Sequence, residues 1–239
     1  MTALGFLHPG HSAEDDYPRI EQLLGSDVRL QVVHTDTDEG VRGVDALRET
    51  GSADRLAAGV EELRLSGAEA VVWAATGGSS AHGWQGAHEQ VGALARAAGL
   101  PASATSFGFV HAVRELGATR VAVGGTDADD VAALFSSFLA EAGLDVVSVR
   151  RSGPGTGGWG EAEVLALVRA ADHTDAEAVL LPDASLRTAS FLPALEKELG
   201  RPVLTASQVT VWEALRLAGR RVHAPELGTL FTKEPVVQV

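Results

Sequence analysis

A loop rich in glycine and hydroxyl groups is the first part of this sequence whose residue types could do chemistry. Residues 75–80 read Ala-Thr-Gly-Gly-Ser-Ser and follow an apolar run that ends at Ala74. Glycines let a ligand approach the backbone, and amide and hydroxyl groups where a helix starts can hold a carboxylate or a phosphate. The candidates for such an oxyanion cradle are Thr76, Gly77, Gly78 and Ser79. The same residues could instead form a glycine turn with a serine cap, and no lysine follows in the spacing of a nucleotide-binding P-loop.

Two aspartates in the second half of the chain could supply acid–base chemistry. Asp127 closes the run Gly-Gly-Thr-Asp, and Asp183 lies in the run Pro-Asp-Ala-Ser-Leu-Arg-Thr at 182–188. To donate a proton near neutral pH, Asp183 needs its pKa raised from ~3.9 to about 7, which burial or a nearby like charge can achieve. We therefore predict Asp183 as the catalytic acid or base and Asp127 as its charged neighbour or its partner in a carboxylate pair. Each aspartate could instead be an ordinary helix cap.

The residues beside Asp183 are candidates for substrate contacts. Ala184 and Ser185 follow it directly, and Arg187 could either pair with Asp183 or grip a substrate carboxylate. The glycine-rich segment 153–160 has the composition of a lid, in which Trp159 could close over a ligand, or of a plain linker.

Composition excludes several kinds of chemistry and partner. The 239 residues include no cysteine, so thiolate nucleophiles, thiolate metal sites and iron–sulfur clusters are impossible. The net charge of −13 disfavours nucleic acid and anionic membranes as partners. We find no metal-ligand spacing among the eight histidines, no long apolar run and no leader-like start, so we expect no metal or cofactor and a cytoplasmic protein.

Short apolar runs alternate with helical patterns along the chain, which predicts an α/β fold with mainly parallel sheets flanked by helices. The predicted strands are 4–7, 28–33, 70–74, 120–123, 146–149, 178–181 and 203–204. The predicted helices are 54–64, 89–98, 131–142, 161–171 and 211–218.

An internal duplication predicts two pseudo-symmetric lobes. Four pairs of segments match in the same order: 68–71 with 176–179, 101–114 with 202–216, 25–28 with 143–146, and 15–16 with 129–130. We place the lobes at 1–117 and 118–239, with the last helix and the tail able to cross back. Ligands of α/β proteins bind beyond the carboxyl ends of strands, so we expect the site in the cleft between the lobes.

At these loops the sequence resembles the aspartate/glutamate racemase superfamily, and within it the group of arylmalonate decarboxylase, maleate cis-trans isomerase and EutA-like ectoine-utilisation proteins. The resemblance covers nearly the whole chain and is most specific at 202–219 (PVLTASQVTVWEALRLAG). It implies two pseudo-symmetric lobes with the site between them. The family uses one or two cysteines, and Ala75 and Asp183 stand in their places. Thr76 matches a family donor, Asp127 falls where the family has tyrosine, and Ser12 falls where maleate isomerase has asparagine.

Three functions fit these residues. The first is a cofactor-independent lyase or isomerase, decarboxylase-like, that acts on a small carboxylic acid with Asp183 as acid or base. The second is a catalytically silent homologue that binds small carboxylates or regulates. The third is a hydrolase or lyase that uses the pair of Asp127 and Asp183. Alanine-rich helices also allow a homo-oligomer.

Overall fold

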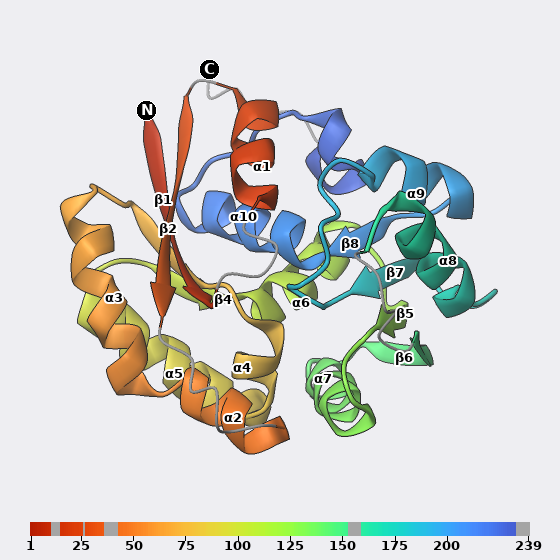
Figure 1. Cartoon of the computed structure of the whole chain (residues 1–239), viewed down its shortest axis with the longest axis horizontal. Helices are drawn as coiled ribbons and strands as arrows, with labels where there is room; N and C mark the ends of the chain where they lie inside the picture. Colours follow the sequence, from red (N-terminus) through yellow and green to blue (C-terminus); the bar gives the residue numbers. More distant parts are fainter. Residues whose placement is uncertain (11–14, 26, 36–42, 153–158, 233–239) are drawn as a thin grey trace.

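The computed structural model describes residues 1–10, 15–25, 27–35, 43–152 and 159–232, and within them the chain forms two four-stranded sheets (Figure 1). The strands of the first sheet are β1 (Thr2–Pro9), β2 (Val28–Thr35), β3 (Ala70–Trp73) and β4 (Ala102–Ala104), in the order β2-β1-β3-β4. The strands of the second sheet are β5 (Arg120–Gly125), β6 (Asp145–Arg151), β7 (Ala178–Leu181) and β8 (Val203–Thr205), in the order β6-β5-β7-β8. Every described pair of neighbouring strands is parallel. We call the segments up to the end of α6 (Thr105–Glu115), which carry β1 to β4, the first half, and those from β5 onward the second half.

The two sheets repeat one topology, which confirms the predicted pseudo-symmetric α/β fold. The third strand of each order, β3 or β7, begins at Ala70 or Ala178, the residues that the sequence match pairs. The fourth strand follows Pro101 in the first half and Pro202 in the second. The matched segments are therefore corresponding elements of two repeated units.

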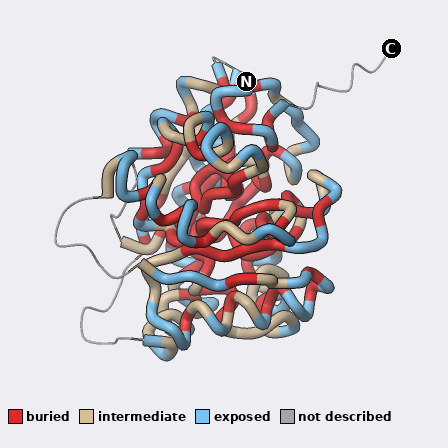
Figure 2. The backbone as a smooth tube through the Cα atoms, turned by 90° about the vertical axis from the view of Figure 1, so that its right-hand side faces the viewer, coloured by how far each residue is buried: buried red, intermediate tan, exposed pale blue. Residues whose placement is uncertain are grey.

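Helices connect the strands and cover the sheets. They are α1 (Asp16–Leu24), α2 (Gly43–Thr50), α3 (Ala53–Leu65), α4 (Thr76–Ser80), α5 (Gly83–Ala98), α6 (Thr105–Glu115), α7 (Asp129–Glu141), α8 (Glu161–Ala171), α9 (Leu192–Leu199) and α10 (Ala206–Leu217). Two short 3₁₀ turns, Pro225–Leu227 and Thr229–Phe231, follow α10. Residues of β3 and β7 are buried throughout, because helices cover both faces of parallel sheets, and buried backbone fills the centre of the molecule in Figure 2.

Helix α10 links the halves, because it follows the second sheet in sequence yet packs against β3, β4 and β1 of the first. It also packs closely on α6, and the two helices lie side by side in the middle of Figure 1. Gly108 makes this approach possible, since a Cβ there would lie 2.9 Å from Cγ1 of Val209. The predicted junction at 117–118 lies between α6 and β5, and the division into lobes there stays a prediction.

Several elements differ from the sequence predictions. Strand β4 was not predicted, because its three residues, Ala-Ser-Ala, form no apolar run. The predicted glycine loop after β3 is the short helix α4, although glycine and serine are poor helix formers. Its glycines are closely packed, since a Cβ at Gly77 would lie 3.1 Å from Leu47 and one at Gly78 would lie 2.9 Å from Trp73. Helices α1, α2, α6 and α9 were also not predicted.

Candidate active site

The carboxyl ends of β3 and β7 meet between the halves. Thr76, the first residue of α4, donates a hydrogen bond from Oγ1 to the carbonyl oxygen of Pro182 at 2.8 Å. Both groups are buried, and Asp183 directly follows Pro182. The structure therefore brings the predicted cradle and the predicted catalytic loop next to each other.

Asp183 is buried and held by a set of hydrogen bonds. Its Oδ1 accepts from the backbone nitrogen of Ser185 at 2.8 Å and from Ser185 Oγ at 2.6 Å. Its Oδ2 accepts from Oγ1 of Thr126, which follows β5. Both carboxyl oxygens of Asp183 thus have a fixed orientation, set by Ser185 on its own loop and by Thr126 directly after the adjacent strand.

Asp127 follows β5 beside Asp183 and is partly buried. Burial, and next the negative charge of Asp183, raise the pKa of Asp127 from 3.8 to about 6, while the nearby Arg151 opposes this change. The sequence interpretation assigned the raised pKa to Asp183 and the role of charged neighbour to Asp127. In the structure the pKa of Asp127 is raised, first by its own burial and second by the neighbouring charge of Asp183.

A small cavity of about 20 Å³ lies between the halves, with room for about one water molecule. Its polar and charged lining comes from both halves: Thr76, Gly77 and Ser80 from the first, and Asp127, Arg150 and Arg151 from the second. Its apolar wall includes Val123, Val131, Phe135 and Val149. The cavity therefore places hydroxyl groups, a titratable carboxyl group and guanidinium groups around one space.

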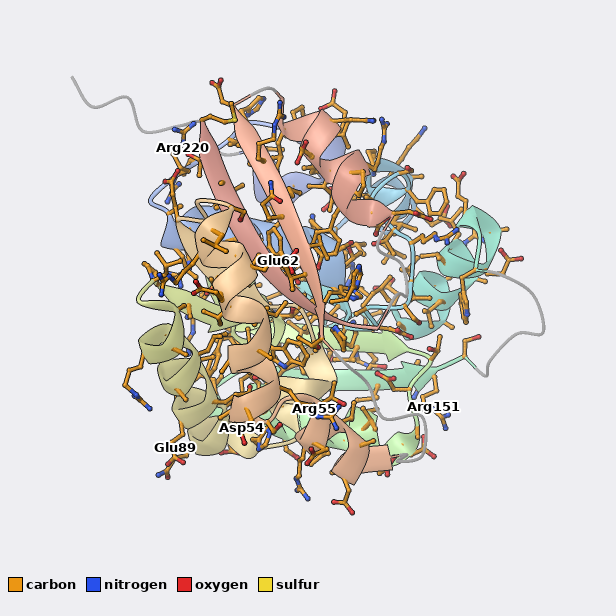
Figure 3. The ribbon with its side chains drawn as sticks, turned by 60° about the vertical axis from the view of Figure 1, so that its left-hand side comes forward. Asp54, Arg55, Glu62, Glu89, Arg151 and Arg220 are labelled. Carbon is orange, nitrogen blue, oxygen red and sulfur yellow. The ribbon has the colours of Figure 1, made fainter. Side chains whose placement is uncertain are left out.

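Ser80 and Arg151 are site residues that the sequence interpretation missed. The hydroxyl of Ser80 is buried and has no hydrogen-bond partner in the described part of the chain. Arg151, labelled in Figure 3, ends β6 and forms an ion pair with Asp129 at 2.8 Å. The run of two serines after the glycines was a signal for Ser80, but a sequence does not tell which of two neighbouring serines faces a cavity.

Two of the four predicted cradle residues lie behind the cavity wall. Gly78 packs against the Trp73 indole, since a Cβ at Gly78 would lie 2.9 Å from Nε1, and its carbonyl oxygen accepts from Gln90 at 3.1 Å. Ser79 is fully buried and is not among the described residues that line the cavity. The reason is helical geometry, because successive residues of α4 point about 100° apart around its axis.

The remaining candidates have other places. Ser185 positions Asp183 rather than lining the cavity, and Ala184 beside it is half-buried. Arg187 pairs with Asp15 on the surface at 2.9 Å, not with Asp183. Trp159 packs against the hydrophobic cluster under α8 instead of covering the cavity. Ser12 lies outside the described residues.

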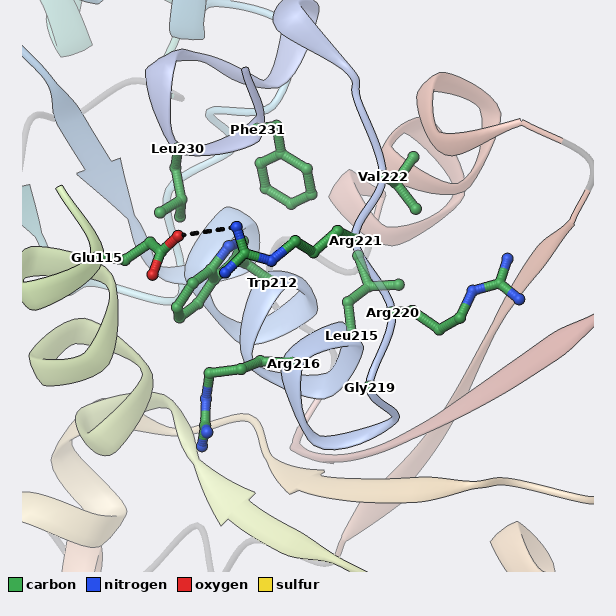
Figure 4. Close-up of a pocket in the computed structure, with 10 residues that line it drawn as sticks. All are labelled: Glu115, Trp212, Leu215, Arg216, Gly219, Arg220, Arg221, Val222, Leu230 and Phe231. Atoms are coloured by element: carbon green, nitrogen blue, oxygen red, sulfur yellow. Dashed lines mark ion pairs between the residues drawn. The ribbon is translucent and has the colours of Figure 1, made fainter. Parts of the chain in front are cut away.

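A second cavity, of about 310 Å³, lies beside α10 and the 3₁₀ turns (Figure 4). Its arginines are largely neutralised, because Arg221 pairs with Glu115 at 3.3 Å and Arg216 pairs with the buried Glu213 at 2.7 Å. Arg220 extends away from both in Figure 4. This cavity brings together no acid–base pair, so the smaller one is the candidate active site.

The described residues contain neither a candidate metal cluster nor a helix that could span a membrane. No cluster of three or more histidine, aspartate or glutamate side chains there is arranged to hold a metal ion. No helix in the same residues has the length and apolar character needed to cross a membrane.

Comparison with known proteins identifies the family. The profile of the arylmalonate decarboxylase family matches residues 40–231. The arylmalonate decarboxylase of Bordetella bronchiseptica is 34% identical over 146 residues, which are 58% of this chain. That alignment spans 61% of the relative's length.

Solved structures give the same result. A double mutant of arylmalonate decarboxylase in its liganded form superposes with a TM-score of 0.83 at 26% identity, over 98% of this chain and 100% of the other. A variant of the maleate isomerase Iso from Pseudomonas putida S16, solved with maleate, superposes with a TM-score of 0.85 over 98% of this chain and 100% of that chain. Because the identity is only 14%, this similarity shows the fold alone. The resemblance stated from the sequence is confirmed, and the chain belongs to the arylmalonate decarboxylase family.

Proposed function

We propose that the protein is a cofactor-independent lyase or isomerase of the decarboxylase type that acts on a small carboxylic acid. The observation that carries the proposal is the pair of carboxyl groups that follow two neighbouring strands. Asp127 lines the cavity, and Asp183 lies close to it on the loop to which Thr76 bonds at Pro182. The family match supports this kind of reaction. The pair takes the place of cysteine chemistry, which the sequence excludes.

The pair divides into an acid and a base. Asp127, with a pKa of about 6, holds a proton in a useful fraction of molecules near neutrality and is suited to be the general acid. Asp183 is the charged partner, fixed by Thr126 and Ser185. A pair of carboxyl groups in which the pKa of one is raised is a recurring arrangement for acid–base catalysis.

Decarboxylation at this site needs two steps. The bond between the α-carbon and the departing carboxylate breaks, carbon dioxide leaves, and the electron pair passes into an enediolate on the remaining carboxyl group. Donors around the cavity, the Ser80 hydroxyl, the Gly77 amide and the Arg151 guanidinium, stabilise the negative charge that develops there. Asp127 then gives its proton to the α-carbon and regains one from water. In an isomerisation, Asp183 would take the proton that Asp127 replaces.

The charges of the site restrict the substrate. The negative charge of Asp183 disfavours a second carboxylate beside it, whereas Arg150 and Arg151, which line the cavity, attract one. We therefore propose that a substrate carboxylate lies toward β6 and that the reacting carbon lies toward Asp127. The substituent of the α-carbon that lies toward Asp183 is then a neutral or cationic group, and neither carboxylate of a decarboxylation substrate lies beside Asp183.

A panel of acids tests the proposal. Malonates, maleate, and amino and hydroxy acids are screened by thermal shift and by release of carbon dioxide. We expect at least one acid to bind and to be turned over, and turnover to be lost in both Asp183→Asn and Asp127→Asn. Failure of every acid to bind would show that the cavity is not a carboxylate site.

A second function, a catalytically silent homologue that binds carboxylates, is favoured by two observations. The Thr76 hydroxyl already donates to Pro182, and the cavity holds little more than one water molecule. Under this reading, acids would raise the melting temperature of the wild type and of Asp183→Asn alike, without turnover. The pH–rate profile separates the two functions further, because general-acid catalysis by Asp127 requires a limb near its pKa of about 6.

A further inference from the structure

Asp16, at the start of α1, is a buried carboxylate that belongs to neither the predicted nor the observed lining of the cavity. Its Oδ2 accepts from the backbone nitrogen of Thr188 at 2.9 Å and from Oγ of Ser207 at 2.6 Å. The backbone nitrogen of Ala189 lies 3.3 Å from each carboxyl oxygen, and Thr188 Oγ1 lies 3.4 Å from Oδ2. One side chain of the first half therefore collects donors from two separate segments of the second half.

The donors of Asp16 belong to the loop that carries Asp183. This loop leaves β7 at Pro182, where Thr76 of the first half donates to the backbone, and reaches Thr188 and Ala189 six and seven residues later. The first half thus holds the loop at both ends, with Asp183 between the two points of attachment. Ser207 adds α10 to the same junction.

A comparison with the second half shows that Asp16 differs from an ordinary acidic residue at the start of a helix. The corresponding acidic residues, Asp129 and Asp130, begin α7 and are exposed. Asp130 accepts a hydrogen bond only from the next residue of its own helix among the described contacts, at 2.9 Å. The donors to Asp16, by contrast, lie on Thr188, Ala189 and Ser207, so its side chain is directed toward the loop and α10 rather than toward its own helix.

Burial makes the ionised form of the Asp16 side chain unfavourable. Burial raises the pKa of Asp16 above its ordinary value, and the hydrogen bonds from Ser207, Thr188 and Ala189 act in the opposite direction. A buried carboxylate is tolerated where several donors converge on it. Here the donors it orders are backbone amides of the Asp183 loop.

We propose that Asp16 is a positioning residue, which fixes the loop 182–189 against the first half and thereby sets the position of Asp183 relative to Asp127 and Thr76. Its effect on catalysis rests on the proposed function, whereas its effect on the loop does not. Truncation of Asp16 should therefore release the amides of Thr188 and Ala189 and move Asp183 away from Asp127.

Two measurements without substrate test the structural part. Asp16→Ala and Ser207→Ala are compared with Asp130→Ala, a matched change at the exposed acid of α7. Hydrogen exchange should speed up at Thr188 and Ala189 in both test variants and stay unchanged in the control. In an NMR titration, the pKa of Asp127 should fall toward its ordinary value in Asp16→Ala, because part of its elevation comes from the charge of Asp183.

Unchanged exchange in both test variants would overturn the proposal, as would an unmoved pKa of Asp127 in Asp16→Ala. Ser207→Ala, which removes a single hydroxyl, remains informative should Asp16→Ala fail to fold.

The catalytic part uses an acid that the wild type turns over. A misplacement of about 1 Å can cost on the order of 100-fold in rate, so kcat should fall by about that factor in Asp16→Ala while KM changes much less. Asp16→Asn, which keeps one acceptor oxygen, should recover part of kcat. Faster loop exchange without any wild-type turnover would support the positioning role and refute the proposed function, whereas unchanged kcat with intact wild-type activity would refute the positioning role alone.

Discussion

Replacing Asp127 by asparagine should stabilise the fold, and the gain should grow with pH. The change keeps the size of the side chain and removes its charge. Asp127 has a pKa of about 6 in the folded protein against an ordinary value of 3.8. Since the folded state binds this proton more tightly than the unfolded state, Asp127 opposes folding increasingly as the pH rises from about 4 to about 6, and asparagine avoids that cost.

The magnitude follows from the two pKa values. Their difference corresponds to about 3 kcal/mol of unfolding free energy once both states are ionised, near pH 8. At about pH 4.5 the same two values give about 1 kcal/mol, because the unfolded state is then mostly ionised and the folded state mostly protonated. The advantage of Asp127→Asn over the wild type should therefore grow by about 2 kcal/mol between these pH values.

Urea unfolding of both proteins at the two pH values measures this difference. Other titrating groups cancel in the comparison, and so do the pH-independent effects of the new amide. In the background of Asp183→Asn the growth should be smaller, because the charge of Asp183 contributes to the elevated pKa of Asp127. An advantage that is constant or shrinks as the pH rises would refute the description of Asp127 as a buried partner of a charged Asp183.

Three further changes test the contacts around the site. Thr76→Val leaves the buried carbonyl oxygen of Pro182 without its donor and should cost about 1–3 kcal/mol in urea unfolding. Burial alone would raise the pKa of Glu213, but hydrogen bonds hold this pKa below its ordinary value. Glu213 therefore stabilises the fold above about pH 4.5, and this stabilisation is lost as the pH falls through the folded pKa. Glu213→Gln should therefore cost about 3–5 kcal/mol at neutral pH and clearly less in acid, and an equal cost at both would contradict the ion-pair account. Gly108→Ala places a methyl group 2.9 Å from Val209 and should cost about 1–3 kcal/mol, whereas an unchanged melting temperature would show that α6 and α10 pack less closely.

The sequence was informative where one property dominates a segment. Strands β3 and β7 are short apolar runs, because both of their faces are covered, and their bounds were predicted to within one residue. The repeated order of segments led to the two-sheet topology, and the loops after the strands led to Thr76, Asp127 and Asp183.

What the sequence could not give depends on three-dimensional neighbours. Burial, and next the charge of Asp183, raise the pKa of Asp127, and residue spacing in the chain predicts neither that burial nor the distance between the two aspartates. Ser80 faces the cavity and Ser79 does not, since one helical step separates them. Asp16 gains its role from donors that lie 172 and more residues away in the chain. The sequence match paired Asp16 instead with the exposed acids of α7, which make no such contact among the described residues.

Turnover in heavy water tests the central claim most directly, namely that Asp127 and Asp183 form an acid–base pair that acts on a small carboxylic acid. Malonates, maleate, and amino and hydroxy acids are incubated with the wild type and with Asp127→Asn and Asp183→Asn, and deuterium on the product α-carbon is followed by NMR. We predict incorporation from at least one acid with the wild type and none with either variant. Incorporation by either variant at the wild-type rate, or none from any acid with the wild type, would contradict the account.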